Sequence, residues 1–231
     1  MRLSRAWVRK RVRQFFATPE SERQQRLARW ESNWEVEAAR PEEDLSQVLP
    51  IEVQDAARTG WFPAGSHVFD IGSGRGQISA WLADQGYTVL GGELTEAGTA
   101  LARKHFGDDP NIEFRVLDIC RATPEPARFD VLLDRGTFHC IPDSWCDAYV
   151  RNVATWARPG ARFLLMHRLF GYDDTPIERR QRSLDDRIRG QMAPYFDCER
   201  SAPTIEAMMR SAGAVPRLTM PGMAFWLTRR S

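Results

Sequence analysis

Short runs rich in β-branched and aromatic residues alternate with segments of helical periodicity from residue 61 onward. The runs that we expect to form strands are His67–Ile71, Tyr87–Gly91, Ile112–Leu117, Phe129–Asp134, Ala161–His167, Val215–Met220 and Ala224–Thr228. The first five are separated by turn residues and by helical segments such as Gly76–Gln85 and Ala97–Phe106. Strands that alternate with helices in this way predict βαβ units and a parallel sheet.

The last two expected strands are joined differently. Only Pro221, Gly222 and Met223 lie between them, which leaves room for a tight turn and none for a crossover helix. Parallel strands need a crossover connection, whereas antiparallel strands can be joined by a hairpin. We therefore expect an antiparallel pair at one edge of an otherwise parallel α/β sheet.

The distribution of charge sets the N-terminus apart. The chain has 32 Lys and Arg and 31 Asp and Glu. Residues 1–15 contain basic side chains and no acidic one, so the rest of the chain is mildly acidic. Six apolar residues in this segment recur at the spacing of a helix: Leu3, Trp7, Val8, Val12, Phe15 and Phe16. A basic amphipathic helix of this kind could contact anionic lipid or RNA, or serve as an organellar presequence. We prefer a third interpretation, in which the helix lies across the domain.

Composition excludes several classes of protein. The balance of charge over the whole chain argues against a protein that coats nucleic acid. The apolar runs are far shorter than the roughly 20 residues needed to cross a bilayer, and no apolar signal-peptide core follows the basic start. The four cysteines form no CxxC pair, which indicates reduced thiols. We expect a cytoplasmic globular protein, a monomer or a homodimer, with no membrane contact.

A glycine-rich loop follows the first expected strand. Its sequence is Asp70-Ile71-Gly72-Ser73-Gly74-Arg75-Gly76-Gln77, and a helical segment comes directly after it. Glycine is needed where the chain turns sharply or where a ligand must approach the backbone. The spacing is GxGxG and differs from the GxGxxG of dinucleotide-binding folds. Glu93 ends the next strand, where a carboxylate can accept both ribose hydroxyl groups of an adenosine.

These strings resemble the cofactor signature of the class I S-adenosylmethionine-dependent methyltransferases. The matching elements are Asp70-x-Gly72-x-Gly74-x-Gly76, Gly92-Glu93-Leu94 and Leu117-Asp118-Ile119. The resemblance implies a Rossmann-like, seven-stranded, mostly parallel sheet with an antiparallel last strand and helices on both faces. It covers about residues 61–231, so we expect a methyltransferase domain over 61–231 and an N-terminal helical extension, or lid, over 1–60.

Carried over by position, the resemblance implies S-adenosyl-L-methionine as the cofactor and a role for each residue. The glycines would let the loop backbone pass close to the methionine part of the cofactor. Asp70 would orient the loop or contact the cofactor's amine, directly or through water. Glu93 would bind the ribose and Asp118 the adenine amino group. The residues expected to contact the cofactor are Asp70, Gly72, Ser73, Gly74, Gly76, Gln77, Glu93, Leu94, Asp118, Ile119, Asp134, Arg135 and Trp34.

The fourth expected strand leads into a second string, Phe-Asp-x-x-x-Asp-Arg-Gly-x-Phe-His-x-x-Pro, from Phe129 to Pro142. It is similar to the subgroup of thiopurine, thiol, halide and tellurite-resistance methyltransferases, which act on small, soft or heteroaromatic nucleophiles. The loop beyond a strand's carboxyl end faces the crevice of an open α/β sheet. We therefore expect His139 and Asp134 to serve catalysis, and Trp30, Phe138 and His139 to contact the acceptor.

Two features of the expected site stay open. His139 has the residue type of a general base, and it can equally hydrogen-bond within its own loop. Trp30 and Trp34 lie four residues apart on one helical face, which fits a core contact as well as a cofactor contact. A nucleophilic pair of Cys140 with His139 is disfavoured, because adjacent side chains on an extended stretch point apart.

The function that the sequence favours is transfer of a methyl group to a small-molecule thiol, heteroaromatic or hydroxyl acceptor by in-line displacement. Nothing in the sequence resembles a cluster of metal-binding carboxylates, so we expect no metal. Two alternatives remain. One is an RNA or protein methyltransferase that docks through the basic N-terminal arm, although the acidic body disfavours nucleic acid. The other is a non-catalytic module that binds S-adenosylmethionine.

Overall fold

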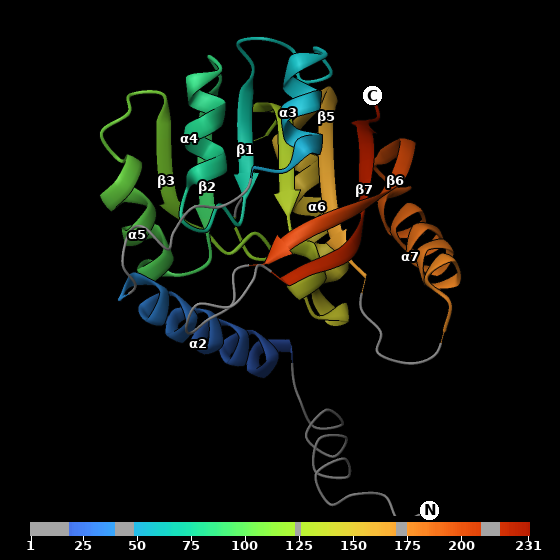
Figure 1. The fold of residues 1–231 in the computed structure, drawn as a ribbon, viewed down its shortest axis with the longest axis horizontal. Coiled ribbons are helices and arrows are strands. Elements are labelled where there is room, and N and C mark those ends of the chain that lie inside the picture. The colour runs from blue at the N-terminus through green and yellow to red at the C-terminus, as the bar shows by residue number, and fades with distance from the viewer. Residues whose placement is uncertain (1–18, 40–48, 123–125, 170–174, 209–217) are drawn as a thin grey trace, which may run out of the picture.

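The structure is a computed structural model that describes residues 19–39, 49–122, 126–169, 175–208 and 218–231 (Figure 1). The basic amphipathic segment of residues 1–16 lies outside the described residues. The described helices are α2 (Pro19–Ala38), α3 (Ile51–Arg58), α4 (Gln77–Asp84), α5 (Glu96–Phe106), α6 (Cys146–Trp156) and α7 (Ile177–Met192). The strands are β1 (His67–Ile71), β2 (Thr88–Glu93), β3 (Ile112–Val116), β4 (Phe129–Arg135), β5 (Ala157–Arg168), β6 (Phe196–Met208) and β7 (Leu218–Arg229).

One seven-stranded sheet organises the chain, in the order β3-β2-β1-β4-β5-β7-β6. The first five strands of this order are parallel, which confirms the expected βαβ units. The order of the strands reverses between β1 and β4, which are neighbours. In open α/β sheets a ligand crevice forms at such a switch point, outside the carboxyl ends of the strands.

Helices cover both faces of the sheet, as expected. One core cluster contains buried residues of α6 and α7 together with Phe69 and Leu132 of the sheet. The other contains Val53 and Ala56 of α3 and Leu82 of α4, packed on alternate sheet residues such as Val68. Strands buried on both faces read as continuous apolar runs rather than alternating ones, which explains the composition of β1 and β4. α3 is thus part of the helical layer that packs on the sheet.

The C-terminal strands correct one expectation. The runs Val215–Met220 and Ala224–Thr228 are not a hairpin, because the described parts of both belong to the single strand β7. β7 pairs antiparallel with β5 on one side and with β6 on the other, and the sequence reading missed β6. At Gly222 the backbone of β7 comes close to that of β5, since a Cβ there would lie 2.8 Å from the carbonyl oxygen of His167.

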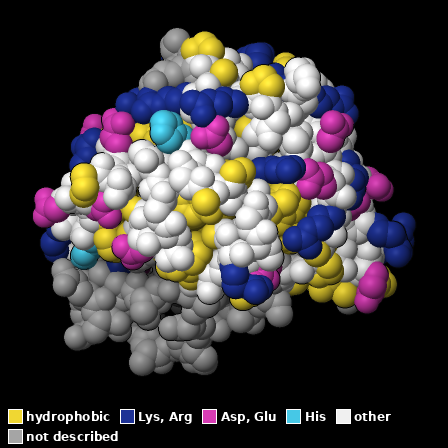
Figure 2. Space-filling view, turned by 90° about the horizontal axis from the view of Figure 1, so that it is seen from above, with side chains coloured by type: hydrophobic (Ala, Val, Ile, Leu, Met, Phe, Trp, Pro, Cys, Tyr) yellow, Lys and Arg dark blue, Asp and Glu magenta, His cyan; other side chains and the backbone are white. Residues whose placement is uncertain are grey.

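α2 lies across the carboxyl ends of the parallel strands, below the sheet in Figure 1. The opposite end of the sheet carries basic and acidic side chains interspersed with apolar ones (Figure 2). Ion pairs such as Arg158 with Asp130 join the two signs there. Among the helices within the described ranges, none combines the length and the apolar character that crossing a bilayer requires.

Candidate cofactor and acceptor site

A cavity of about 520 Å³ opens at the switch point of the sheet, between the strand carboxyl ends and α2. One part of its lining comes from the glycine loop after β1, from Gly92–Leu94 after β2 and from Leu117–Ile119 after β3, and we call it the cofactor half after the role that the sequence predicts. The other part comes from Trp30, Arg135–Thr137, His139–Ile141 and Arg168, and we call it the acceptor half in the same sense. The volume lies in the usual range of small-molecule sites, about 300–1,000 Å³.

Two glycines of the loop are required by their surroundings. Gly72 has φ +71°, and a Cβ there would lie 1.8 Å from Oγ1 of Thr137. The Thr137 hydroxyl donates to the carbonyl oxygen of Ile71 at 2.9 Å, which fixes this contact between the two loops. Gly74 has φ +56°, and its Cβ would lie 3.0 Å from the ring of Trp34. Glycine at these two positions therefore lets the loop backbone line the cavity while it packs directly against Thr137 and Trp34.

Asp70 is a buried carboxylate at the head of the glycine loop, and it lines the cavity. Its carboxylate accepts a hydrogen bond of 2.7 Å from the Ser79 hydroxyl. Burial raises the pKa of Asp70 to about 6, although the Ser79 bond and the charge of Arg135 act in the opposite direction. The protein thus holds a poorly compensated negative charge at the position where the resemblance implies a cationic amine.

Glu93 ends β2 with its carboxylate facing the glycine loop. It accepts from the amide of Gly74 at 3.3 Å, from that of Leu94 at 2.8 Å and from Nε1–H of Trp34 at 3.3 Å. Burial raises the pKa of Glu93, and these donors oppose the rise. Trp34 is therefore in contact with the residue expected to bind the ribose. The sequence left both a core contact and a cofactor contact open for Trp34.

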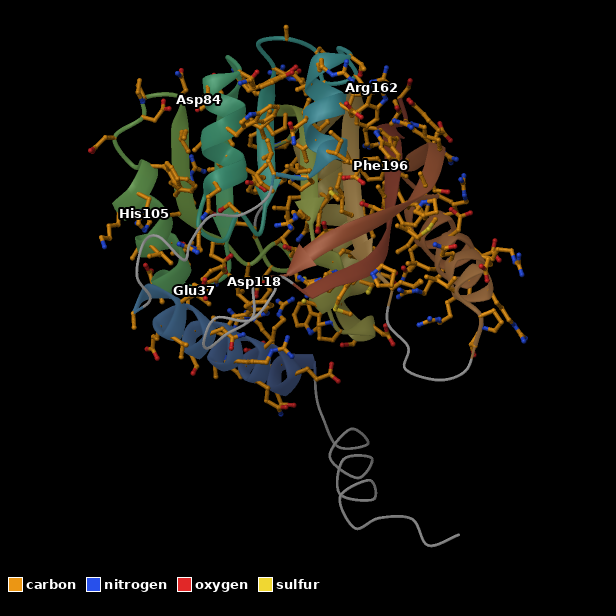
Figure 3. The ribbon with its side chains drawn as sticks, in the orientation of Figure 1. Glu37, Asp84, His105, Asp118, Arg162 and Phe196 are labelled. Carbon is orange, nitrogen blue, oxygen red and sulfur yellow. The ribbon has the colours of Figure 1, made fainter. Side chains whose placement is uncertain are left out.

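Asp118 is held by two arginines of α2. Arg23 donates through Nε at 2.7 Å and Arg26 through Nη2 at 3.2 Å. The Asp118 side chain is only 11% exposed, so the cluster is largely shielded from water. Figure 3 shows Asp118 at the carboxyl end of the sheet, beside α2. The adenine amino group would thus meet a carboxylate that already has partners, an arrangement that the sequence reading did not include.

α2 is tied to the crevice along its whole length. Beyond the Asp118 cluster, Glu31 accepts from the amide of Ala97 at 3.2 Å, at the start of α5. Near the end of α2, Glu37 pairs with Arg75 of the glycine loop at 3.2 Å, and Arg75 is 2% exposed. Figure 3 shows Glu37 at the C-terminal part of α2. These contacts make α2 the roof of the cavity.

Asp134, at the end of β4, shapes the acceptor loop. Its carboxylate is fully buried and accepts from the amides of Thr137 at 2.7 Å and Phe138 at 2.9 Å. It also accepts from the hydroxyl of Tyr149. Desolvation and the Asp134 charge raise the pKa of Tyr149 well above its usual value, so the phenol keeps its proton. Asp134 thus holds the turn that carries His139.

His139 lies in a short 3₁₀ turn, Phe138–Cys140, and lines the cavity. Its Nδ1 accepts a long hydrogen bond of 3.4 Å from the amide of Arg168. The ring of His167 lies 5.4 Å away, centroid to centroid, in an edge-on arrangement. Burial, together with the charges of Arg168 and His167, lowers the pKa of His139 to about 3. The imidazole is therefore neutral at physiological pH, and it is a weak base.

Most residues expected to contact the cofactor line the cavity. They are Asp70, Gly72, Ser73, Gly74, Glu93, Leu94, Asp118, Ile119, Arg135 and Trp34, joined by Trp30 and His139 on the acceptor side. Four expected residues lie behind the lining, Gly76, Gln77, Asp134 and Phe138. Phe138 is buried against Tyr149, with ring centroids 4.8 Å apart. Its place in the core follows from the same turn that presents His139.

Sequence reasoning missed the residues that α2 and β5 bring to the cavity lining or to Asp118. Arg23, Arg26 and Glu37 share a helical face with the two tryptophans, and this spacing was the available signal. Arg168 ends β5 at the carboxyl edge of the sheet, a position that in an α/β fold faces the crevice. Across the described ranges, no group of three or more His, Cys, Asp or Glu side chains is placed to hold a metal ion.

Comparisons with known proteins agree with this geometry. Residues 68–160 match the methyltransferase domain family. The 2-heptyl-1-hydroxyquinolin-4(1H)-one methyltransferase of Mycobacteroides abscessus is 28% identical over 131 residues, 56% of each chain. TehB from Haemophilus influenzae has a TM-score of 0.59 at 16% identity, over 80% of this chain and 64% of that one.

A third similar protein is the 1,6-didemethyltoxoflavin-N1-methyltransferase of Burkholderia thailandensis, solved with its substrate and S-adenosylhomocysteine. Its TM-score is 0.57 at 19% identity, over 78% of each chain. The chain spans about half the length of the curated relatives it matches. The solved structures share the seven-stranded fold, and the family match includes the glycine loop, Glu93, Asp118 and the acceptor loop.

Proposed function

We propose that this chain, a class I S-adenosylmethionine-dependent methyltransferase by its fold and by the family match of residues 68–160, methylates a small-molecule acceptor. The observation that carries the proposal is the cavity at the switch point. There the glycine loop, Glu93 and Asp118 lie on successive strand ends in one crevice with His139. The three comparison proteins named above include two whose names state a small-molecule substrate.

The residues of the cofactor half fit S-adenosyl-L-methionine. Gly72 and Gly74 line the cavity, and their lack of side chains lets the loop pack closely against Thr137 and Trp34 at its wall. The raised pKa of Asp70 indicates a carboxylate that a bound cation would stabilise. Glu93 would accept from a ribose diol through carboxylate oxygens that also accept from Trp34 at Oε1 and from the Gly74 amide at Oε2. When bound, the cofactor supplies a methyl group activated by a sulfonium.

The chain contributes positioning and exclusion of water. α2 and its tryptophans cover the crevice, and its ion pairs with Asp118 and Arg75 hold that cover in place. A covered site orients the acceptor for in-line displacement and removes its hydration shell. In this proposal α2 is the lid, and Trp30 and His139 contact the acceptor.

The test is transfer of a tritiated methyl group from S-adenosylmethionine to panels of small acceptors by the full-length chain. The panels contain thiols, phenols and heteroaromatic rings, and separate reactions contain bulk tRNA or a protein mixture. We expect transfer to at least one small-molecule class and none to tRNA. Transfer confined to tRNA or to protein would refute the small-molecule assignment, and binding of S-adenosylmethionine without any transfer would indicate a non-catalytic module.

A further inference from the structure

Arg168 is fixed in the acceptor half by two histidines that hold its backbone. Its amide donates to Nδ1 of His139 at 3.4 Å, and its carbonyl oxygen lies 2.6 Å from Nδ1 of His167. The other ring nitrogen of His167, Nε2, lies 3.1 Å from Nη2 of Arg187. Since a guanidinium can only donate, His167 accepts at Nε2 and carries its proton on Nδ1, which then donates to Arg168.

The acceptor half combines positive charge with neutral polar groups. Of the described residues that line it, none carries a carboxylate, whereas Arg135 and Arg168 are cationic. Arg168 lines this side together with Cys140. Burial raises the pKa of the Cys140 thiol, whereas the charges of Arg29 and Arg168 act to lower it and that of Asp134 acts to raise it. The four acidic residues in the lining, Glu37, Asp70, Glu93 and Asp118, belong to the cofactor half or to α2.

No group on this side is suited to remove a proton from the acceptor at neutral pH. His139 is neutral, and its one unprotonated nitrogen, Nδ1, already accepts from the Arg168 amide. Both ring nitrogens of His167 are also engaged, Nδ1 with the carbonyl oxygen of Arg168 and Nε2 with Arg187. Burial raises the pKa of the Cys140 thiol, so this group is also protonated and is no base. An acceptor that must lose a proton would therefore have to lose it before or during binding.

We propose that the acceptor is bound as an anion, recognised by the guanidinium of Arg168, and that His139 and His167 are positioning residues that fix Arg168. This inference rests on the proposed methyltransferase function and names its substrate class: small acceptors with an acidic nucleophilic group, such as an aryl thiolate or a phenolate. An arginine beside such a group stabilises the ionised form and so lowers the acceptor's pKa on binding.

The charges balance without a base. The acceptor anion forms a bond to the methyl carbon, the carbon–sulfur bond breaks, and its electron pair stays on sulfur. The acceptor becomes neutral, and the sulfonium becomes a neutral thioether. No proton has to be moved in this step, in agreement with the weak basicity of His139. The neutral product loses its attraction to Arg168, which favours its release.

The test measures ligand binding in addition to turnover. The full-length chain, saturated with S-adenosylhomocysteine, is titrated calorimetrically with 4-nitrophenol at mildly alkaline pH, where this ligand is ionised. A second titration uses 4-nitrotoluene, which has nearly the same shape and no charge. We expect the anion to bind at least about tenfold more tightly, the effect of one charge-assisted hydrogen bond.

Two variants of Arg168 and one control complete the design. Arg168→Met should lose the preference for the anion while S-adenosylhomocysteine affinity stays unchanged, and Arg168→Lys should keep part of it, since the charge remains without the planar fork. Arg162→Met is the control, because Arg162 lies at the opposite end of the sheet, paired with Glu199 (Figure 3).

The outcomes separate the two proposals. Equal binding of the anion and the neutral ligand, or binding of neither, overturns the anionic-acceptor inference while S-adenosylhomocysteine binding remains intact. If Arg168→Met still prefers the anionic ligand over the neutral one, another residue recognises the anion, and the role of Arg168 is overturned. Failure of the wild-type chain to bind S-adenosylhomocysteine would instead refute the proposed function. Unchanged S-adenosylhomocysteine affinity in Arg168→Met also shows that this variant is folded.

Discussion

Replacing Asp70 by Asn should stabilise the protein at neutral pH and weaken cofactor binding. Asp70 is a buried carboxylate that accepts a hydrogen bond from the Ser79 hydroxyl, and burial raises its pKa from 3.8 to about 6. Asn has nearly the same shape and retains an oxygen that accepts from Ser79, but it cannot ionise. The substitution thus removes a buried charge with little change in packing.

The pKa shift sets the sign and the size of the effect. Because the folded-state pKa lies above the unfolded value, the folded protein binds more protons between pH 3.8 and about 6. The free energy of unfolding therefore falls as pH rises through this window, and stays lowered above it. A shift of this size corresponds to about 3 kcal/mol, at 1.36 kcal/mol for each pKa unit. The stability of Asp70→Asn relative to wild type should rise by that amount across the window.

Urea denaturation at a series of pH values gives the free energy of unfolding of both proteins. Subtracting one from the other at each pH removes the contribution of titrating groups that the two proteins share. Ser79→Ala is the matched control, since loss of the hydroxyl should raise the pKa of Asp70 further and move the transition to higher pH. A difference in stability that does not change with pH would refute the assignment of a raised pKa. Unchanged S-adenosylmethionine affinity in Asp70→Asn would refute its cofactor contact.

Three further substitutions test other contacts. Gly74→Val should abolish calorimetric binding of S-adenosylhomocysteine in a folded protein, because φ is +56° and its Cβ would lie 3.0 Å from the Trp34 ring; retained affinity would contradict the loop assignment. Asp118→Ala should cost up to roughly 3 kcal/mol in denaturation and speed amide exchange in α2, by leaving Arg23 and Arg26 without their shared carboxylate; unchanged exchange would show that these pairs do not hold α2. His139→Ala should lower kcat/KM about tenfold for phenols and thiols alike, through Arg168, whereas a larger loss for phenols would support a general base.

The cofactor half of the site could be predicted from the sequence because its determinants are local. Each motif there combines a buried strand with the loop that directly follows it, and the backbone of a parallel sheet brings such loops to one edge. The glycine loop, Glu93 and Asp118 therefore lie where the spacing placed them. The family resemblance supplied their roles, which remain proposals.

The partners of these residues could not be predicted in the same way, because they come from distant segments. Arg23 and Arg26 meet Asp118 only through the docking of α2, and such pairings leave no trace in local sequence. β6 was missed because its strand, Phe196–Met208, contains charged residues and Pro203, which are depleted in central strands and tolerated at an edge. Pro221 and Gly222 suggested a turn, whereas Gly222 lies within β7 and allows a close approach to His167 of β5.

His139 shows the limit of reasoning from residue type. A histidine in the acceptor loop has the chemistry of a general base, and its position in the cavity agrees with that role. Its pKa, however, depends on burial and on Arg168 and His167, which are contributed by β5. These neighbours make the imidazole a weak base, and its Nδ1 accepts a hydrogen bond from the backbone of Arg168.

The most direct test of the central claim is calorimetric titration of S-adenosylhomocysteine into the full-length chain, beside Glu93→Ala. We predict saturable binding at one site in the wild-type chain. In the variant, affinity should be at least about tenfold weaker, since the ribose would lose its carboxylate partner. Absence of binding to the wild-type chain, or equal affinity in Glu93→Ala, would contradict the assignment of this cavity as the cofactor site.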